Sequence, residues 1–107
     1  FIGGEITKSL SSTVGPLTDR ILSEFHFNKA FIGANGCTQH NGISTYDLRE
    51  ASKKRIVAEN SDICYVLLDS SKIGINGICR VFKINEIKVI TEKRSKITDE
   101  NDNFIVL

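Results

Sequence analysis

The chain has 107 residues, of which 40% are hydrophobic and 25% are charged, and these proportions are typical of one globular domain. Fourteen Lys and Arg against thirteen Asp and Glu leave a formal net charge of +1, which provides no overall field for attracting nucleic acid or an acidic membrane. No apolar run reaches the roughly 18 residues that span a bilayer. We therefore expect a soluble, cytoplasmic protein that binds neither DNA nor membrane through this chain.

The three cysteines, Cys37, Cys64 and Cys79, are widely spaced and form no Cys-x-x-Cys pair. With two histidines in the chain, they indicate reduced thiols and neither a metal site nor a cofactor. Cys37 with His40 three residues later is a conceivable nucleophile and base, but adjacency in sequence is weak support for a catalytic pair. An ordinary cysteine is the favoured interpretation.

The first residue is Phe1, and residues 1–4 resemble a strand that has been cut, so we expect a fragment that lacks its N-terminal part. A Ser/Thr-rich loop is predicted over residues 5–14. A helix should follow with Pro16 at an early position and His26 near its negative end. Its expected apolar face consists of Leu17, Ile21, Leu22 and Phe25.

Residues 30–34 form a short apolar run without alternation, which predicts a strand covered on both faces. The run ends at Asn35 and Gly36, and a polar loop is expected to continue to Thr45. A polar loop after a buried strand is where open α/β sheets place ligands.

A second helix is predicted over residues 47–60, with Ser44 or Thr45 as its N-cap. Glu50 and Lys54 stand four apart, and the ordinary interpretation is a surface salt bridge beside a solvated cationic turn at residues 53–55. A ligand-facing role stays open because of the neighbouring loop. The inward residues of this helix should include Leu48, Ala51 and Ile56.

Residues 63–68 are the strongest strand signal, and their continuous apolarity again predicts cover on both faces. Strands alternating with helices indicate an α/β fold with a mostly parallel sheet flanked by helices. Further strands are expected at residues 78–82, 87–90 and 104–107. The charged stretch from 91 to 103 is predicted to be a solvated connection.

Three polar loops, at residues 33–36, 42–45 and 69–74, should adjoin at one edge of this sheet and form a crevice for a small anion. Lys72 supplies a point charge suited to phosphate, and neighbouring amide, hydroxyl and carboxylate groups suit sugar hydroxyls. An equally acceptable interpretation is a turn in which Asp69 binds backbone N–H groups and Lys72 faces water. No dinucleotide-binding glycine motif occurs.

Taken in order over residues 1 to about 91, several segments resemble the C-terminal sensor domain of DeoR-type bacterial transcriptional regulators. They are Phe1–Glu5, Val14–Leu17, Lys29–Gly36, Gly42–Thr45, Glu50 with Lys54 and Arg55, and Asp69–Gly74. The resemblance implies a fold like that of ribose-5-phosphate isomerase and a phosphorylated sugar as effector. It also implies an N-terminal winged helix-turn-helix domain, absent from this chain, that binds operator DNA, and a phosphate loop upstream of residue 1.

The resemblance implies that Lys72 approaches the phosphate and that Gly36, Thr45, Glu50 and Lys54 face the sugar or shape its loops. The isomerase has an aspartate where this chain has Asn35, which cannot ionise to act as a general base. Binding without turnover is therefore expected, with no catalytic residue. The predicted ligand-binding residues are Asn35, Gly36, Thr45, Glu50, Lys54, Asp69 and Lys72.

These features predict that residues 1–107 are part of the phosphosugar-sensing domain of a DeoR-type repressor of sugar-metabolism genes. An aldose–ketose sugar phosphate isomerase is the alternative, and a plain assembly domain is a third possibility. We expect a homo-oligomer, since operator-binding regulators tend to match two-fold sites. Residues 92–107 depart from the family pattern.

Overall fold

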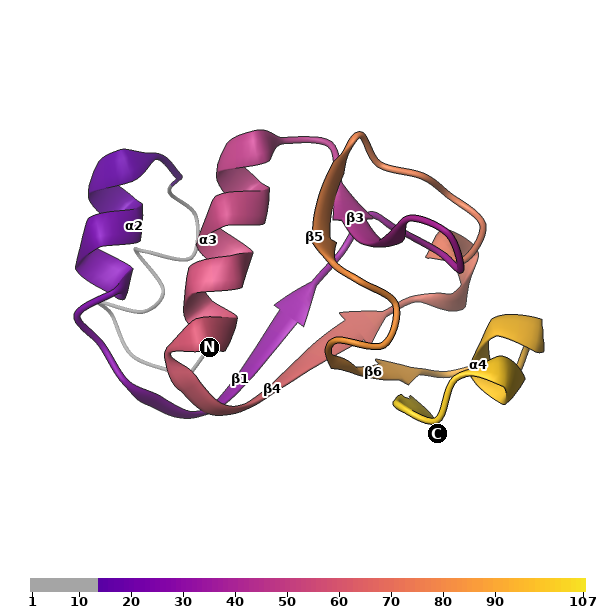
Figure 1. Ribbon diagram of the computed structural model, residues 1–107. Helices are drawn as coiled ribbons and strands as arrows, with labels where there is room; N and C mark the ends of the chain where they lie inside the picture. Colours follow the sequence, from indigo (N-terminus) through magenta and orange to yellow (C-terminus); the bar gives the residue numbers. More distant parts are fainter. Residues whose placement is uncertain (1–13) are drawn as a thin grey trace.

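The computed structural model describes residues 14–107, so the strand predicted at 1–4 and nearly all of the loop predicted at 5–14 lie outside the described residues. The elements in chain order are α2 (Pro16–Leu22), β1 (Phe27–Gly33), β2 (Gly36–Thr38), β3 (Gly42–Thr45), α3 (Leu48–Glu59), β4 (Ser61–Leu68), the 3-10 turn η1 (Ser70–Lys72), β5 (Cys79–Phe82), β6 (Lys88–Thr91), α4 (Lys96–Glu100) and β7 (Phe104–Val106). Figure 1 shows their arrangement.

The main sheet has four strands in the order β1-β4-β6-β7, and every neighbouring pair is parallel. Val66 in β4 pairs with Ile32 on one side and Val89 on the other, and all three side chains are buried. This row lies in the hydrophobic core. The prediction of an α/β fold with a mostly parallel sheet is confirmed.

Helix α2 begins with proline at its first turn, as expected, but it ends at Leu22. The predicted apolar face is therefore only partly correct. Leu22 is buried, whereas Leu17 is 72% exposed and Phe25 lies beyond the helix. Likewise His26 stands outside the helix, where its ring forms a 2.8 Å hydrogen bond with Asp62.

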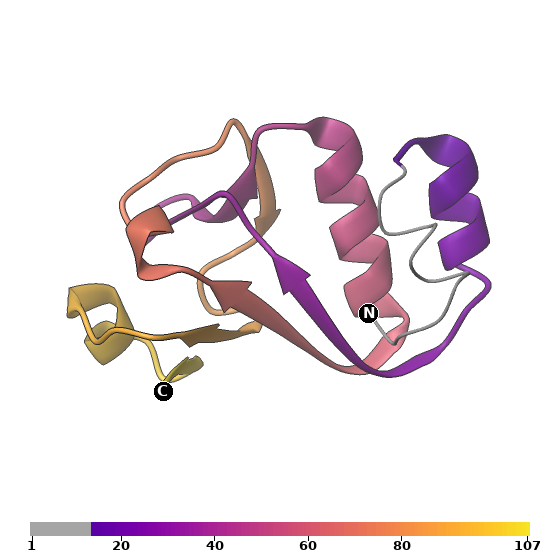
Figure 2. The ribbon, with the colours of Figure 1, turned by 180° about the vertical axis from the view of Figure 1, so that it is seen from behind.

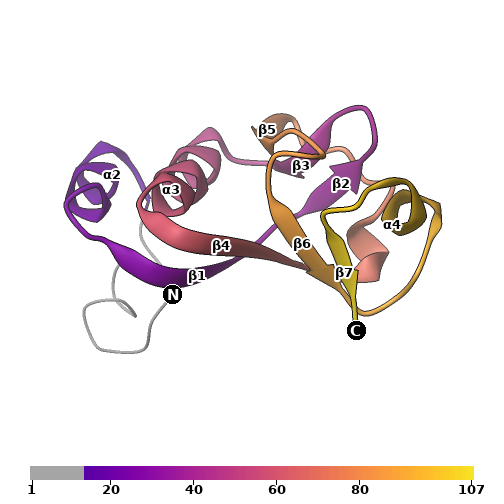
Figure 3. The ribbon, with the colours of Figure 1, turned by 60° about the horizontal axis from the view of Figure 1, so that its bottom comes forward.

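Helix α3 is capped by Asp47, whose carboxylate accepts a 2.8 Å hydrogen bond from the Arg49 N–H. The prediction of Ser44 or Thr45 as the cap was wrong because both lie in β3. Ala51 is buried as expected, but Leu48 is 71% exposed. Helix α2 packs against α3, and both lie on the same face of the main sheet (Figures 1 and 3).

A second, antiparallel sheet in the order β2-β3-β5 occupies much of the region that was predicted to be one loop. The hairpin between β2 and β3 turns at Gly42, which has φ of +76°. Gly36 lies against the backbone carbonyl of Ile75, so any Cβ at this position would clash. The third strand, β5, comes from far along the sequence, which is why local pattern could not reveal this sheet.

The other face of the main sheet, seen in Figure 2, carries neither α2 nor α3. Phe31, Ile63 and Leu67 on this face are 42%, 38% and 48% exposed. The rings of Phe31 and Tyr65 stack with centroids 5.5 Å apart. Within the described residues, the prediction that both strands are covered on both faces was therefore wrong.

The charged stretch after β6 is more ordered than predicted, since it contains α4, with Ile97 and Thr98 buried. The Ser95 N–H donates to the Thr98 hydroxyl at 2.8 Å at the start of this helix. The predicted final strand is confirmed as β7, paired with β6. None of the helices within residues 14–107 has the length and apolar character to cross a membrane.

Candidate functional site

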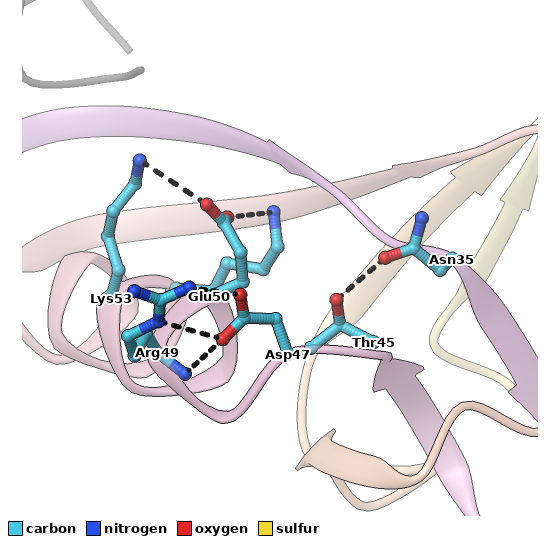
Figure 4. Close-up of polar contacts among 7 residues, drawn as sticks. Asn35, Thr45, Asp47, Arg49, Glu50 and Lys53 are labelled. Atoms are coloured by element: carbon cyan, nitrogen blue, oxygen red, sulfur yellow. Dashed lines mark hydrogen bonds and ion pairs between the residues drawn. The ribbon is translucent and has the colours of Figure 1, made fainter. Parts of the chain in front are cut away.

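Asn35 and Thr45 meet where β1 and β3 end. The Thr45 hydroxyl donates a 2.6 Å hydrogen bond to the side-chain carbonyl of Asn35, and the Asn35 N–H donates to the Ser44 carbonyl at 3.0 Å. Thr45 is 2% exposed, whereas Asn35 is exposed. In Figure 4 the amide nitrogen of Asn35 points away from Thr45. The pair therefore presents N–H donors outward from a fixed side chain.

Glu50 in the first turn of α3 lies between two lysine ammonium groups (Figure 4). The Nζ of Lys53 is 3.9 Å from Oε1 of Glu50, and the Nζ of Lys54 is 3.7 Å from Oε2. Both distances are within ion-pair range but are longer than a hydrogen bond. The predicted pairing of Glu50 with Lys54 is thus present, and Lys53 joins it.

The prediction of a solvated cationic turn at residues 53–55 was wrong for Lys53 and Lys54. The side chains of Lys53 and Lys54 are 4% and 17% exposed. Burial lowers the pKa of Lys53; Glu50 and, more weakly, Asp19 raise it, and Lys54 lowers it further. Only Arg55 is exposed, and its guanidinium donates to the backbone carbonyls of Arg80 and Val81.

A cavity of about 190 Å³ lies between β1 and α3. Its walls combine apolar side chains with the Glu50 cluster, and they consist of Phe31, Ile32, Gly33, Glu50, Lys53, Lys54 and Val57. Asn35 follows Gly33 by two residues, so the Asn35–Thr45 pair stands at the same end of β1 as this cavity. The arrangement offers cations, one carboxylate and amide donors beside a small apolar recess.

The loop after β4 lies beside β2. The Gly74 N–H donates a 2.8 Å hydrogen bond to the Cys37 carbonyl, and Ile73 forms an isolated parallel bridge with Cys37. Asp69 accepts a 3.0 Å hydrogen bond from the Ser71 N–H, so it has the turn-capping role that sequence reasoning had left open. Lys72 forms no ion pair within residues 14–107 and does not line the cavity.

Glu92, immediately after β6, was missed by sequence reasoning. Its carboxylate accepts hydrogen bonds from the Ser70 N–H and the Ser70 hydroxyl, both at 2.8 Å, and from the Thr91 hydroxyl at 3.1 Å. Its own backbone N–H and the Ser70 donors lower the pKa of Glu92 to about 2. No local pattern connects residues that are 22 positions apart, so the sequence held no signal for this contact.

Cys37 is not a candidate nucleophile, because its side chain is fully buried and burial raises the pKa of the thiol to about 11. The thiolate is the reactive form, so little of it exists near neutral pH. All three cysteines are free thiols, as predicted. Across residues 14–107, no group of His, Cys, Asp and Glu side chains is arranged to bind a metal.

Comparison with known proteins shows which family this chain is similar to. Residues 1–93 match the family described as "DeoR C terminal sensor domain". The lactose phosphotransferase system repressor of Staphylococcus epidermidis is 31% identical over 103 residues, which are 95% of this chain and 38% of the repressor. The L-fucose operon activator of Haemophilus influenzae is 27% identical over 98% of this chain and 45% of the activator. An HTH-type transcriptional regulator of Bacillus subtilis is 32% identical over 84% of this chain and 35% of its own length.

The structure is an α/β domain with a recess at the end of its parallel strands. The sequence matches sensor domains of transcriptional regulators. The chain belongs to the DeoR C-terminal sensor family, and the predicted resemblance is confirmed, including a ribose-5-phosphate isomerase-like fold. It is a sensor domain, so the isomerase alternative does not stand. The chain spans less than half the length of these relatives.

Proposed function

We propose that this domain senses a phosphorylated sugar and controls a DNA-binding domain elsewhere in the same protein. The observation that carries the proposal is the cavity between β1 and α3, where Glu50 stands between two lysine ammonium groups. The names of two relatives refer to lactose and fucose systems, which supports a sugar as the class of ligand. The full protein would then be a regulator of sugar-metabolism genes, acting as a repressor.

The chemistry of the recess suits a sugar phosphate. The Glu50 carboxylate accepts hydrogen bonds from sugar hydroxyls, and the outward amide of Asn35 donates to sugar oxygens. Ammonium groups complement phosphate. The isomerase has an aspartate where this chain has Asn35, which cannot ionise to act as a general base. Gly36, Asp69 and Lys72 belong to the proposed site through the family resemblance.

DNA binding is assigned to a winged helix-turn-helix domain outside these residues, because a chain with a net charge of +1 has no overall attraction for phosphate backbones. The effector must bind the DNA-competent and DNA-released forms with different affinities, since a ligand shifts an equilibrium only by that difference. A homo-oligomer would match the two-fold symmetry of an operator.

The test is fluorescence anisotropy of operator DNA bound by the full-length protein, titrated with pentose and hexose phosphates. We expect at least one of them to release the DNA, and Glu50→Gln to retain DNA affinity while losing the response. If no sugar phosphate changes the anisotropy or binds the protein, the proposed function is wrong.

A further inference from the structure

Two central strands of the main sheet, β4 and β6, end side by side. The turn Asp69–Lys72 follows β4, and Glu92 follows β6 directly. The register pairs Leu68, the last residue of β4, with Thr91, the last residue of β6. Open α/β sheets bind their ligands at the carboxyl ends of parallel strands. Glu92 therefore lies at the edge of the sheet where the loops of the proposed site are found.

Glu92 binds the first residue of η1 with both carboxylate oxygens. Its Oε1 accepts a 2.8 Å hydrogen bond from the Ser70 N–H, and its Oε2 accepts one of 2.8 Å from the Ser70 hydroxyl. Because the pKa of Glu92 is about 2, the group is ionised at neutral pH and these hydrogen bonds are charge-assisted. Two bonds to one residue restrict both the position and the direction in which the turn begins.

The other end of η1 is fixed by β2. Immediately after Lys72, Ile73 forms a parallel bridge with Cys37, and the Gly74 N–H donates a 2.8 Å hydrogen bond to the Cys37 carbonyl. Within the turn, the Lys72 N–H donates to the Asp69 carbonyl at 2.9 Å. Lys72 thus stands between two anchors. Its ammonium group forms no ion pair within residues 14–107, so its charge is available to an anionic group.

We propose that Glu92 is a positioning residue of the effector site, which holds η1 through Ser70 so that Lys72 meets the phosphate of the effector. This inference rests on the proposed function and on the phosphate contact that the family resemblance implies for Lys72. Fixing the turn before binding lowers the cost of ordering it when the ligand arrives. Glu92 acts through the turn and not as a ligand, because both of its oxygens are engaged by Ser70.

The experiment is a double-mutant cycle in the full-length protein, with Glu92→Ala, Lys72→Ala and both changes together. Calorimetry measures the affinity for a panel of pentose and hexose phosphates, and melting without ligand measures stability. We expect Glu92→Ala to weaken binding roughly tenfold, comparable to the loss of one charged hydrogen bond. In the Lys72→Ala background the same change should have little further effect on affinity, because residues that act as a unit are not additive.

The two ends of β6 provide a matched control. Glu86 precedes this strand, and its carboxylate accepts a 2.8 Å hydrogen bond from the Lys83 N–H, so it also holds a turn. Glu86→Ala should bind sugar phosphates as wild type does, even if it melts at a lower temperature. Glu92→Gln keeps an oxygen that can accept from the Ser70 N–H, and it should recover most of the affinity that Glu92→Ala loses.

A lower melting temperature in Glu92→Ala with unchanged affinity would make Glu92 purely structural and overturn the inference. Fully additive losses in the double variant, unchanged affinity in Lys72→Ala, or equal losses in Glu86→Ala would also overturn it, and the proposed function would stand if wild type binds normally. If Glu92→Ala does not fold, Ser70→Ala replaces it in the cycle, and a loss of affinity that persists without Lys72 contradicts the inference. If wild type binds no sugar phosphate, both proposals fail.

Discussion

The hydroxyl of Thr45 lies 2.6 Å from the side-chain carbonyl of Asn35 and donates a hydrogen bond to it, joining the end of the antiparallel hairpin to the end of a parallel strand. This bond decides which way the Asn35 amide faces. Because the carbonyl oxygen is engaged, the amide nitrogen with its two N–H donors lies on the side away from Thr45, as Figure 4 shows.

Thr45→Val should remove the hydrogen bond that orients the Asn35 amide, while the side chain at position 45 keeps nearly the same shape. We expect a loss of about 0.5–1.5 kcal/mol in the free energy of unfolding, typical of one hydrogen bond, and a several-fold weaker affinity for the effector. Thr38→Val is the control for loss of a hydroxyl outside the cavity, since the Thr38 hydroxyl donates to Asn76 at 2.7 Å, accepts from the Asn41 N–H at 3.0 Å and does not line the cavity. Chemical denaturation and calorimetry provide the two measurements. Equal losses of affinity in both variants would contradict a specific role for the Asn35–Thr45 pair.

Lys72→Ala tests the phosphate contact implied by the resemblance. Lys72 forms no ion pair within the described part of the chain, so its removal should leave the melting temperature almost unchanged. If Lys72 contributes to phosphate binding, calorimetry will show a weaker affinity. Full retention of affinity would remove Lys72 from the site.

The Glu92 carboxylate should make the free energy of unfolding depend on pH. The pKa of its carboxyl is lowered to about 2 in the folded chain, below the ordinary value of roughly 4.3. The stabilisation is therefore fully present above the unfolded pKa and disappears as the pH falls from there to about 2. Denaturation of wild type and Glu92→Gln across this range should show a shallower slope in the variant. Parallel curves would mean that the contact with Ser70 does not persist in solution.

Thiol chemistry tests the burial of Cys37. With its pKa raised to about 11, the Cys37 thiol should not react with Ellman's reagent at pH 8 in the native protein and should react at once in denaturant. Cys37→Ala should still bind the effector, because this side chain is part of the core. Rapid native modification of Cys37 would show that the core opens readily.

Pattern in the sequence was sufficient to locate β4, because residues 63–68 form a continuous apolar run of strand length, and it also placed a strand at residues 87–90, which overlaps β6. It was insufficient for β2 and β3, which are only three and four residues long and pair with each other, while β3 also pairs with β5 more than 30 residues later. The same limit applies to the site. The spacing of Glu50 and Lys54 could be read from the sequence. The burial of Lys53 depends on how α3 packs against β1, and the order of charged residues along the chain does not reveal that packing.

The most direct test of the cavity as the effector site is NMR mapping of the backbone amides of the full-length protein during addition of the sugar phosphate that it binds. We expect the largest shift changes at Phe31–Gly33 and in the first two turns of α3, with smaller ones at Asn35 and Thr45. Changes confined to other surfaces, with these amides unmoved, would contradict a site between β1 and α3.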